Sequence, residues 1–114
     1  MHELGIVFHI IKTIEDVAAE QNLTRVSKVV LEVGEVSAVI PEYLQDCWQW
    51  ACRRSPLMNG SVLQNEIIPA VTYCESCGKT YETVKHAKVC PHCGSEQTYL
   101  LEGNGVQIRE IEAE

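Results

Sequence analysis

The chain has 114 residues, which is enough for one domain of ordinary size with a small appended module and excludes two large domains. Its formal net charge is -7, from 16 acidic residues against 9 lysines and arginines, and no stretch collects basic residues, so nucleic acid is excluded as an expected partner. No basic region precedes the first apolar stretch, and no apolar run approaches the roughly 20 residues of a membrane-crossing helix, so we expect a soluble cytoplasmic protein with no membrane partner.

The first predicted element is a helix over residues 4–21, because its apolar side chains recur at helical spacing. His9 falls on the opposite face and is expected in solvent, and Asn22 is suited to the left-handed residue that ends a helix. The predicted buried stripe comprises Leu4, Val7, Phe8, Ile11, Ile14 and Ala18.

A strand, a second helix and a second strand are predicted next. The segment RVSKVVLEVGEV, residues 25–36, alternates and is rich in β-branched residues, which predicts a strand with one strongly apolar face. In IPEYLQDCWQWACRR, residues 40–54, Pro41 suits a helical first turn and apolar residues follow at helical spacing. Alternation resumes in SVLQNEIIPAV, residues 61–71, and predicts a second strand.

Two cysteines lie in the second predicted helix. Cys47 and Cys52 are five residues apart, a spacing that matches no pair of metal ligands on a helix. We therefore interpret both as small apolar core residues rather than as ligands or redox partners.

The other four cysteines form two C-x-x-C pairs separated by twelve residues. Two residues between cysteines let one tight turn direct both thiolates at the same point, and Gly78 and Gly94 supply the unhindered backbone of such turns. Two redox-active dithiols are the less favoured alternative, because a redox motif is normally single. The spacing predicts a structural Zn²⁺ with a closed shell, held by Cys74, Cys77, Cys90 and Cys93.

Two histidines accompany this module. His86 and His92 could replace a cysteine, but four thiolates already saturate the metal, so exposed or outer-shell imidazoles are the favoured interpretation. A pH-sensitive role of these histidines stays open.

The chain ends with EGNGVQIREIEAE, residues 102–114, in which a Gly-Asn-Gly turn precedes a bulged or edge strand. The fold class expected is α+β, with two helices packed on a three-stranded sheet and an inserted zinc ribbon. The expected domains are an α/β domain over residues 1–70, completed by the C-terminal strand at 104–114, and a zinc-ribbon domain over 71–103.

The opening Met-His-Glu suggests a second metal site. The Met1 amine, the His2 backbone nitrogen and the His2 ring can form adjoining chelate rings in a plane, a geometry that suits Ni²⁺ or Cu²⁺. Glu3 lies in the first turn of a helix, where a carboxylate is favourable through the helix dipole alone, so its part as a ligand is left open.

The MHE opening, the strand VVLEVGEVSAV, the paired CESC and CPHCGS and the closing GNGVQIREIEAE together resemble the HypA/HybF family of hydrogenase maturation nickel chaperones. The resemblance covers essentially the whole chain. It implies a nickel-binding α/β domain with a zinc ribbon inserted before the last strand. Carried over by position, the nickel ligand is His2, supported by Met1 and Glu3. Its zinc ligands are Cys74, Cys77, Cys90 and Cys93.

The same resemblance implies a function. Ni²⁺ is carried and delivered to the large subunit of [NiFe] hydrogenase together with the GTPase HypB, and in some members to urease maturation. Which of these is served, and whether the chain is a monomer or a homodimer, stays open. No nucleophile with a base and no glycine-rich phosphate loop is visible, so the chain is not expected to be an enzyme. The competing hypothesis is a zinc-ribbon adaptor that binds protein only, with MHE incidental.

Overall fold

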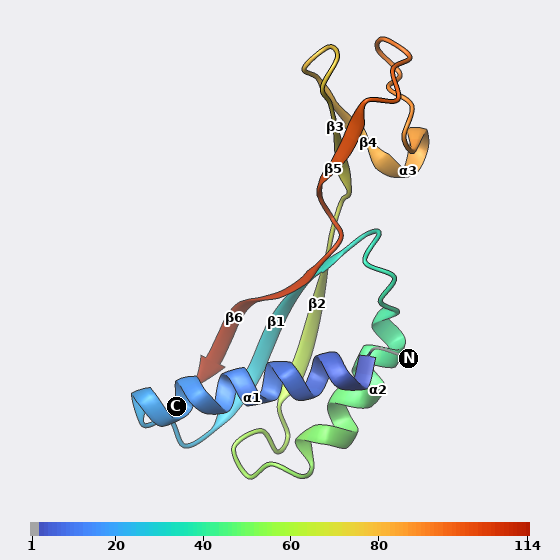
Figure 1. The fold of residues 1–114 in the computed structure, drawn as a ribbon. Coiled ribbons are helices and arrows are strands. Elements are labelled where there is room, and N and C mark those ends of the chain that lie inside the picture. The colour runs from blue at the N-terminus through green and yellow to red at the C-terminus, as the bar shows by residue number, and fades with distance from the viewer. Residues whose placement is uncertain (1–2) are drawn as a thin grey trace. The chain divides into compact units, whose positions relative to one another are not determined.

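The computed structural model describes residues 3–114, and the predicted nickel ligands Met1 and His2 lie outside the described residues. Residues 3–114 form two sheets and three helices, and the strands of the second sheet are inserted between β2 and β6 of the first, which confirms the α+β class (Figure 1). The elements are α1 (Glu3–Gln21), β1 (Val26–Gly34), α2 (Pro41–Cys52), β2 (Val62–Ile68), β3 (Val71–Cys74), β4 (Thr80–Glu82), α3 (Thr83–His86), β5 (Thr98–Glu102) and β6 (Val106–Ala113).

The first helix begins and ends as its sequence predicts, but two residues of its predicted stripe are not buried: Phe8 is exposed and Leu4 is half-buried. Val7 and Ile14 are fully buried, and Asn22 has a φ of 56°, the left-handed conformation expected after the last turn. Phe8, however, is 47% exposed, and Ile10 is buried in its place. The buried stripe is centred on Val7 and Ile14, and Phe8 lies about 100° around the helix from Val7. Its ring packs edge-on against the exposed Trp50 of α2, with ring centroids 6.0 Å apart.

The second helix starts at Pro41, whose missing N–H costs nothing in a first turn. Its buried side chains include Leu44 and Trp48, the core face that the helical spacing predicted. Cys52 is also buried, and this burial raises the pKa of its thiol to about 11. Cys47 is half-buried. A buried thiol with a raised pKa behaves as a small apolar side chain, as interpreted from the sequence for Cys52.

The three-stranded sheet has the order β2-β1-β6, so β1 is its central strand. Val29, Leu31 and Val33 are buried, as their alternation predicted. Val30, on the opposite face, is buried as well. The last strand, β6, is an edge strand, one of the two alternatives expected for it.

A second sheet with the order β4-β3-β5 builds the cysteine-rich part of the chain. Both pairings of β3 are antiparallel, with Thr72 opposite Tyr81 on one side and opposite Leu100 on the other. The sequence predicted the metal site of this segment but not the sheet, whose strands are too short to show a period of two.

The chain divides into two compact units. The first unit comprises Met1–Leu31, Val39–Glu66 and Gln107–Glu114, and the second comprises Glu32–Ala38 and Ile67–Val106.

None of the helices among residues 3–114 is long and apolar enough to cross a membrane.

Candidate metal centre

The candidate metal centre is a cluster of four cysteine sulfurs in the second unit. The Sγ atoms of Cys74, Cys77, Cys90 and Cys93 all lie within 4.8 Å of one another. The Sγ atoms of Cys74 and Cys93 are 3.6 Å apart, and those of Cys77 and Cys90 are 3.7 Å apart. A regular tetrahedron with metal–sulfur bonds of about 2.3 Å has edges of about 3.8 Å. The sulfur positions therefore fit a tetrahedral ion of the size of Zn²⁺.

Each cysteine pair is shaped by the same backbone turn. Gly78 donates from its N–H to the carbonyl of Cys74 at 2.9 Å, and Gly94 donates to the carbonyl of Cys90 at 2.8 Å. Both glycines have positive φ values, 73° and 75°, in the region where a side chain is strained. The prediction that a glycine after each pair permits the turn is confirmed by these backbone angles.

The two turns are joined to each other beside the sulfurs. The hydroxyls of Ser76 and Ser95 lie 2.8 Å apart, and the N–H of Glu75 donates to the carbonyl of Gln97 at 2.9 Å. These two hydrogen-bonded contacts hold the two cysteine turns beside each other, although the turns are far apart in the sequence. None of these four residues could be assigned such a role from spacing alone.

The rest of the module has a very small apolar core. Its buried cluster consists of Cys74, Tyr81 and Cys90, two of which are candidate ligands. The Tyr81 hydroxyl donates to the carbonyl of Ala87 at 2.8 Å, which anchors the chain before the second cysteine pair. With so little apolar burial, an ion bound at the sulfurs would supply much of what orders this segment.

The protonation of the thiols shows why the cluster suits a cation. The backbone N–H of Cys77, followed by the side chain of Cys93, lowers the pKa of Cys74 to about 7. The N–H of Ser95 lowers the pKa of Cys93, but burial and the hydrogen bonds with the other thiols outweigh it and raise this pKa to about 12. Four thiolates in one cluster repel one another, so full ionisation requires a positive ion among them.

The remaining candidate ligands do not join the cluster. His86 and His92 are exposed, as favoured from the sequence, and among residues 3–114 no other group of three or more His, Cys, Asp or Glu side chains is arranged to hold a metal ion. His9 is exposed on α1, as predicted. The Tyr81 and His86 rings contact each other edge-on, with centroids 5.9 Å apart.

Glu3, a predicted nickel-site residue, has a contact that the sequence did not suggest. Its side chain is only 4% exposed, and its Oε2 accepts a hydrogen bond of 3.1 Å from the backbone N–H of Ile40. Ile40 is the residue before α2, and it has no side-chain cap of its own. Glu3 therefore ties the first turn of α1 to the start of α2, a long-range contact that no local pattern predicts.

Ala87 provides a test of how the segment between the cysteine pairs is held. Its φ of 53° and ψ of -120° lie in a region that is essentially restricted to glycine. We expect Ala87→Gly to stabilise the metal-loaded module by about 1 kcal/mol, because relief of strain exceeds the entropic cost of glycine. Hydrogen exchange of the β3 amides measures this. Ala19→Gly, at an exposed helical position, should instead destabilise α1 by about 1 kcal/mol. Faster exchange in Ala87→Gly would contradict the expectation.

Comparison with known proteins gives a consistent result over the full length. Residues 1–113 match the family described as "Hydrogenase/urease nickel incorporation, metallochaperone, hypA". The chain is 35% identical over 114 residues to hydrogenase maturation factor HybF of Klebsiella pneumoniae, with 100% of both chains covered. It is 32% identical over 114 residues to hydrogenase maturation factor HypA of Dechloromonas aromatica (strain RCB), again with 100% of both covered.

A solved structure has the same fold. The solution structure of the Ni metallochaperone HypA from Helicobacter pylori superposes with a TM-score of 0.77 at 21% identity, covering 99% of this chain and 97% of that one. At that identity, the similarity establishes the fold.

Proposed function

Since this chain belongs to the HypA family of nickel-incorporation metallochaperones for hydrogenase and urease, we propose that its cargo is Ni²⁺, bound at the N-terminus through His2. The Met1 amine and neighbouring backbone nitrogens would complete a nitrogen-rich planar set, the geometry that Ni²⁺ prefers. The family match over residues 1–113 carries this proposal, because it spans both the N-terminal segment and the cysteine cluster.

Two roles can be distinguished for Glu3, that of a nickel ligand and that of a structural residue. As a ligand, its carboxylate would have to give up or share the hydrogen bond from Ile40. As a structural residue, it would keep that bond and fix the first turn of α1 beside the N-terminal site. Its low exposure and its bond to Ile40 favour a supporting role over permanent ligation.

The cysteine cluster is proposed as the site of a resident Zn²⁺ held by Cys74, Cys77, Cys90 and Cys93. When bound, zinc would supply four thiolate bonds and no open position, which suits a structural ion rather than a catalytic one. The sulfur separations of 3.6 and 3.7 Å support this assignment. The zinc-ribbon domain is proposed to span residues 71–103, and the nickel domain to comprise 1–70 with 104–114.

The family and its curated relatives are maturation factors and metallochaperones, so the chain is not an enzyme. We propose the large subunit of [NiFe] hydrogenase as the acceptor of the nickel, the GTPase HypB as a second partner, and the cytoplasm as the location. We further propose that the chain also serves urease maturation and that it forms a homodimer. A zinc-ribbon adaptor without nickel binding is the competing function, and it would hold zinc alone.

Nickel titration of tag-free protein with an authentic Met1 tests the proposal. We expect His2→Ala to keep its zinc and fold but to lose specific nickel binding by at least about a hundredfold, because removal of the imidazole opens the chelate. Binding by the parent should weaken as the pH falls through about 6.5, the ordinary pKa of imidazole, because protons then compete for the ligand. Isothermal titration calorimetry with a competing chelator measures both effects.

Two controls make the titration specific. His9→Ala removes an exposed histidine from α1 and should bind nickel as the parent does. Glu3→Gln keeps an oxygen acceptor for Ile40 and should reduce affinity much less than His2→Ala if Glu3 has a supporting role. Undiminished affinity in His2→Ala would place the nickel site elsewhere and refute the N-terminal assignment.

A further inference from the structure

The outer edge of the three-stranded sheet is covered by helix α2 over only part of its length. The sheet order β2-β1-β6 makes β2 an edge strand. On α2, the Trp48 indole N–H donates to the carbonyl of Ser61 at 3.1 Å. One helical turn earlier, the Gln45 amide donates to the carbonyl of Leu63 at 2.6 Å. Side chains of α2 thus occupy carbonyls that point away from β1.

At Asn65, the next outward-facing position of β2, α2 offers no hydrogen-bond donor. Backbone groups of alternate residues in a strand point the same way, so those of Asn65 face outward like those of Leu63. The residue of α2 three positions before Gln45 is Glu42, and an ionised carboxylate has no hydrogen to donate. In addition, the side-chain Oδ1 of Asn65 is buried and has no hydrogen-bond partner among the described residues. The edge therefore has unmet hydrogen-bonding capacity at Asn65.

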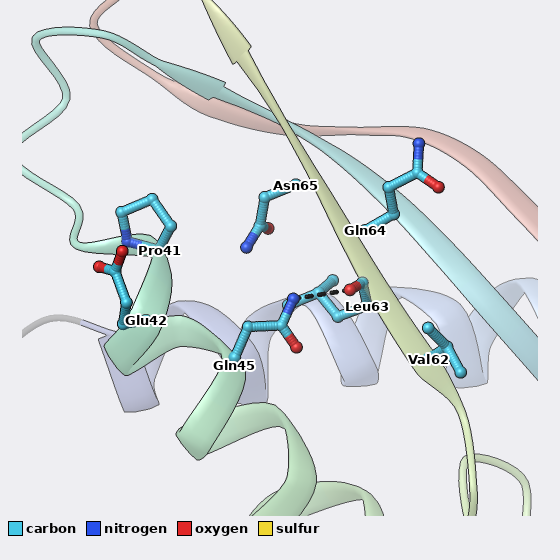
Figure 2. Close-up of a pocket in the computed structure, with 7 residues that line it drawn as sticks. All are labelled: Pro41, Glu42, Gln45, Val62, Leu63, Gln64 and Asn65. Atoms are coloured by element: carbon cyan, nitrogen blue, oxygen red, sulfur yellow. Dashed lines mark hydrogen bonds between the residues drawn. The ribbon is translucent and has the colours of Figure 1, made fainter.

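An open, shallow groove of about 480 Å³ lies at this point, lined by Pro41, Glu42, Gln45, Val62, Leu63, Gln64 and Asn65. Figure 2 shows the carboxamides of Gln45 and Asn65 directed into the space between α2 and β2, with Glu42 beside Pro41 on the helix. The lining contains one carboxylate and no Lys or Arg. All seven residues belong to the first unit.

We propose that this groove between α2 and the outer edge of β2 binds an extended segment of a partner protein that carries a Lys or Arg side chain. An extended segment offers alternating N–H and C=O groups, which match the outward backbone groups of Asn65. The Glu42 carboxylate would pair with the basic side chain, and the formal net charge of -7 would steer a basic segment toward the groove. None of the lining residues is a proposed metal ligand, so the groove adds a partner-binding edge to the proposed function.

The proposal can be tested with a capped Thr-Val-Lys-Val-Thr peptide titrated into ¹⁵N-labelled, zinc-loaded full-length protein. We expect chemical-shift changes at the Asn65 backbone amide and at the side-chain amides of Gln45 and Asn65. Glu42→Gln should weaken binding of this peptide by about tenfold, a change typical of losing one charge-assisted contact. Asn65→Ala should also weaken it, and Glu20→Gln, on the exposed surface of α1, should not.

A matched peptide with Glu in place of Lys should bind at least about tenfold more weakly to the parent protein, and the two peptides should bind Glu42→Gln about equally. The proposal fails if neither peptide shifts these amides, if the Glu peptide binds the parent as well as the Lys peptide, or if Mg²⁺ alone produces the same shifts and competes with the peptide. Zinc content and the spectrum of each free variant establish that it is folded.

Discussion

Replacing Cys74 with alanine should abolish zinc binding and unfold the cysteine-rich module while α1 and α2 persist. The Cys74 sulfur lies 3.6 Å from that of Cys93, inside the four-sulfur cluster, and it also forms a third of the module's small buried core. Structural zinc sites contribute about 10–16 kcal/mol of apparent binding free energy near neutral pH, far more than this core could replace. Removal of zinc from the parent by a chelator should have the same effect.

Zinc content measured by atomic emission, together with amide spectra, tests this prediction. In Cys74→Ala we expect no bound zinc and loss of dispersion for the amides of β3, β4 and β5. Cys47→Ala is the matched control, because Cys47 is half-buried on α2 and is not among the four clustered cysteines, and this variant should keep its zinc. A Cys74→Ala protein with full zinc content, or one in which every helix melts, would contradict the expectation of a metal-ordered module.

Gly34→Ala should destabilise the protein by more than about 3 kcal/mol, a large effect for the addition of one methyl group. A Cβ atom on Gly34 would overlap the backbone carbonyl of Gly103, and one on Gly103 would overlap the backbone of Ala70. Backbone atoms cannot rotate away as the end of a flexible side chain can. Gly103 also has a φ of 98°, so Gly103→Ala adds conformational strain to the overlap.

The hydrogen bonds around these glycines explain why the backbones approach so closely. Gly34 donates from its N–H to the carbonyl of Gly105 at 2.8 Å, and Val36 donates to the carbonyl of Gly103 at 2.8 Å. The Glu35 carboxylate accepts a 2.9 Å hydrogen bond from the N–H of Ala70. An added methyl group would have to push these segments apart and break several of the bonds, which is the source of the expected loss.

Urea unfolding of the zinc-loaded protein measures the loss. Gly5→Ala is the control, because a Cβ on Gly5 meets nothing within 4 Å and alanine favours the helix, so this variant should be more stable by about 0.5–1 kcal/mol. If Gly34→Ala unfolds at the same urea concentration as the parent, the close approach of Gly34 and Gly103 does not constrain the fold.

The sequence by itself determined the features that depend on short spacings. The helical recurrence of apolar residues located α1 and α2, and the β-branched run located β1. The two C-x-x-C pairs, each followed by glycine, predicted the cluster of Cys74, Cys77, Cys90 and Cys93 that the structure assembles. These predictions succeed because a helix face, a strand face and a cysteine turn are each defined within a few residues. The spacing of neighbouring residue types is therefore enough to predict them.

Only the tertiary structure decided the features that depend on which segments meet. Phe8 has helical spacing suited to the core, yet it is exposed and packs against the exposed Trp50 of α2. Glu3 finds the N–H of Ile40, 37 residues away, and Gly34 meets Gly103 from a distant part of the chain. The unmet edge at Asn65 arises because the first turn of α2 carries Glu42 where its later turns carry the donors Gln45 and Trp48. Such contacts arise from packing between segments far apart in the sequence, and local periodicity contains no information about them.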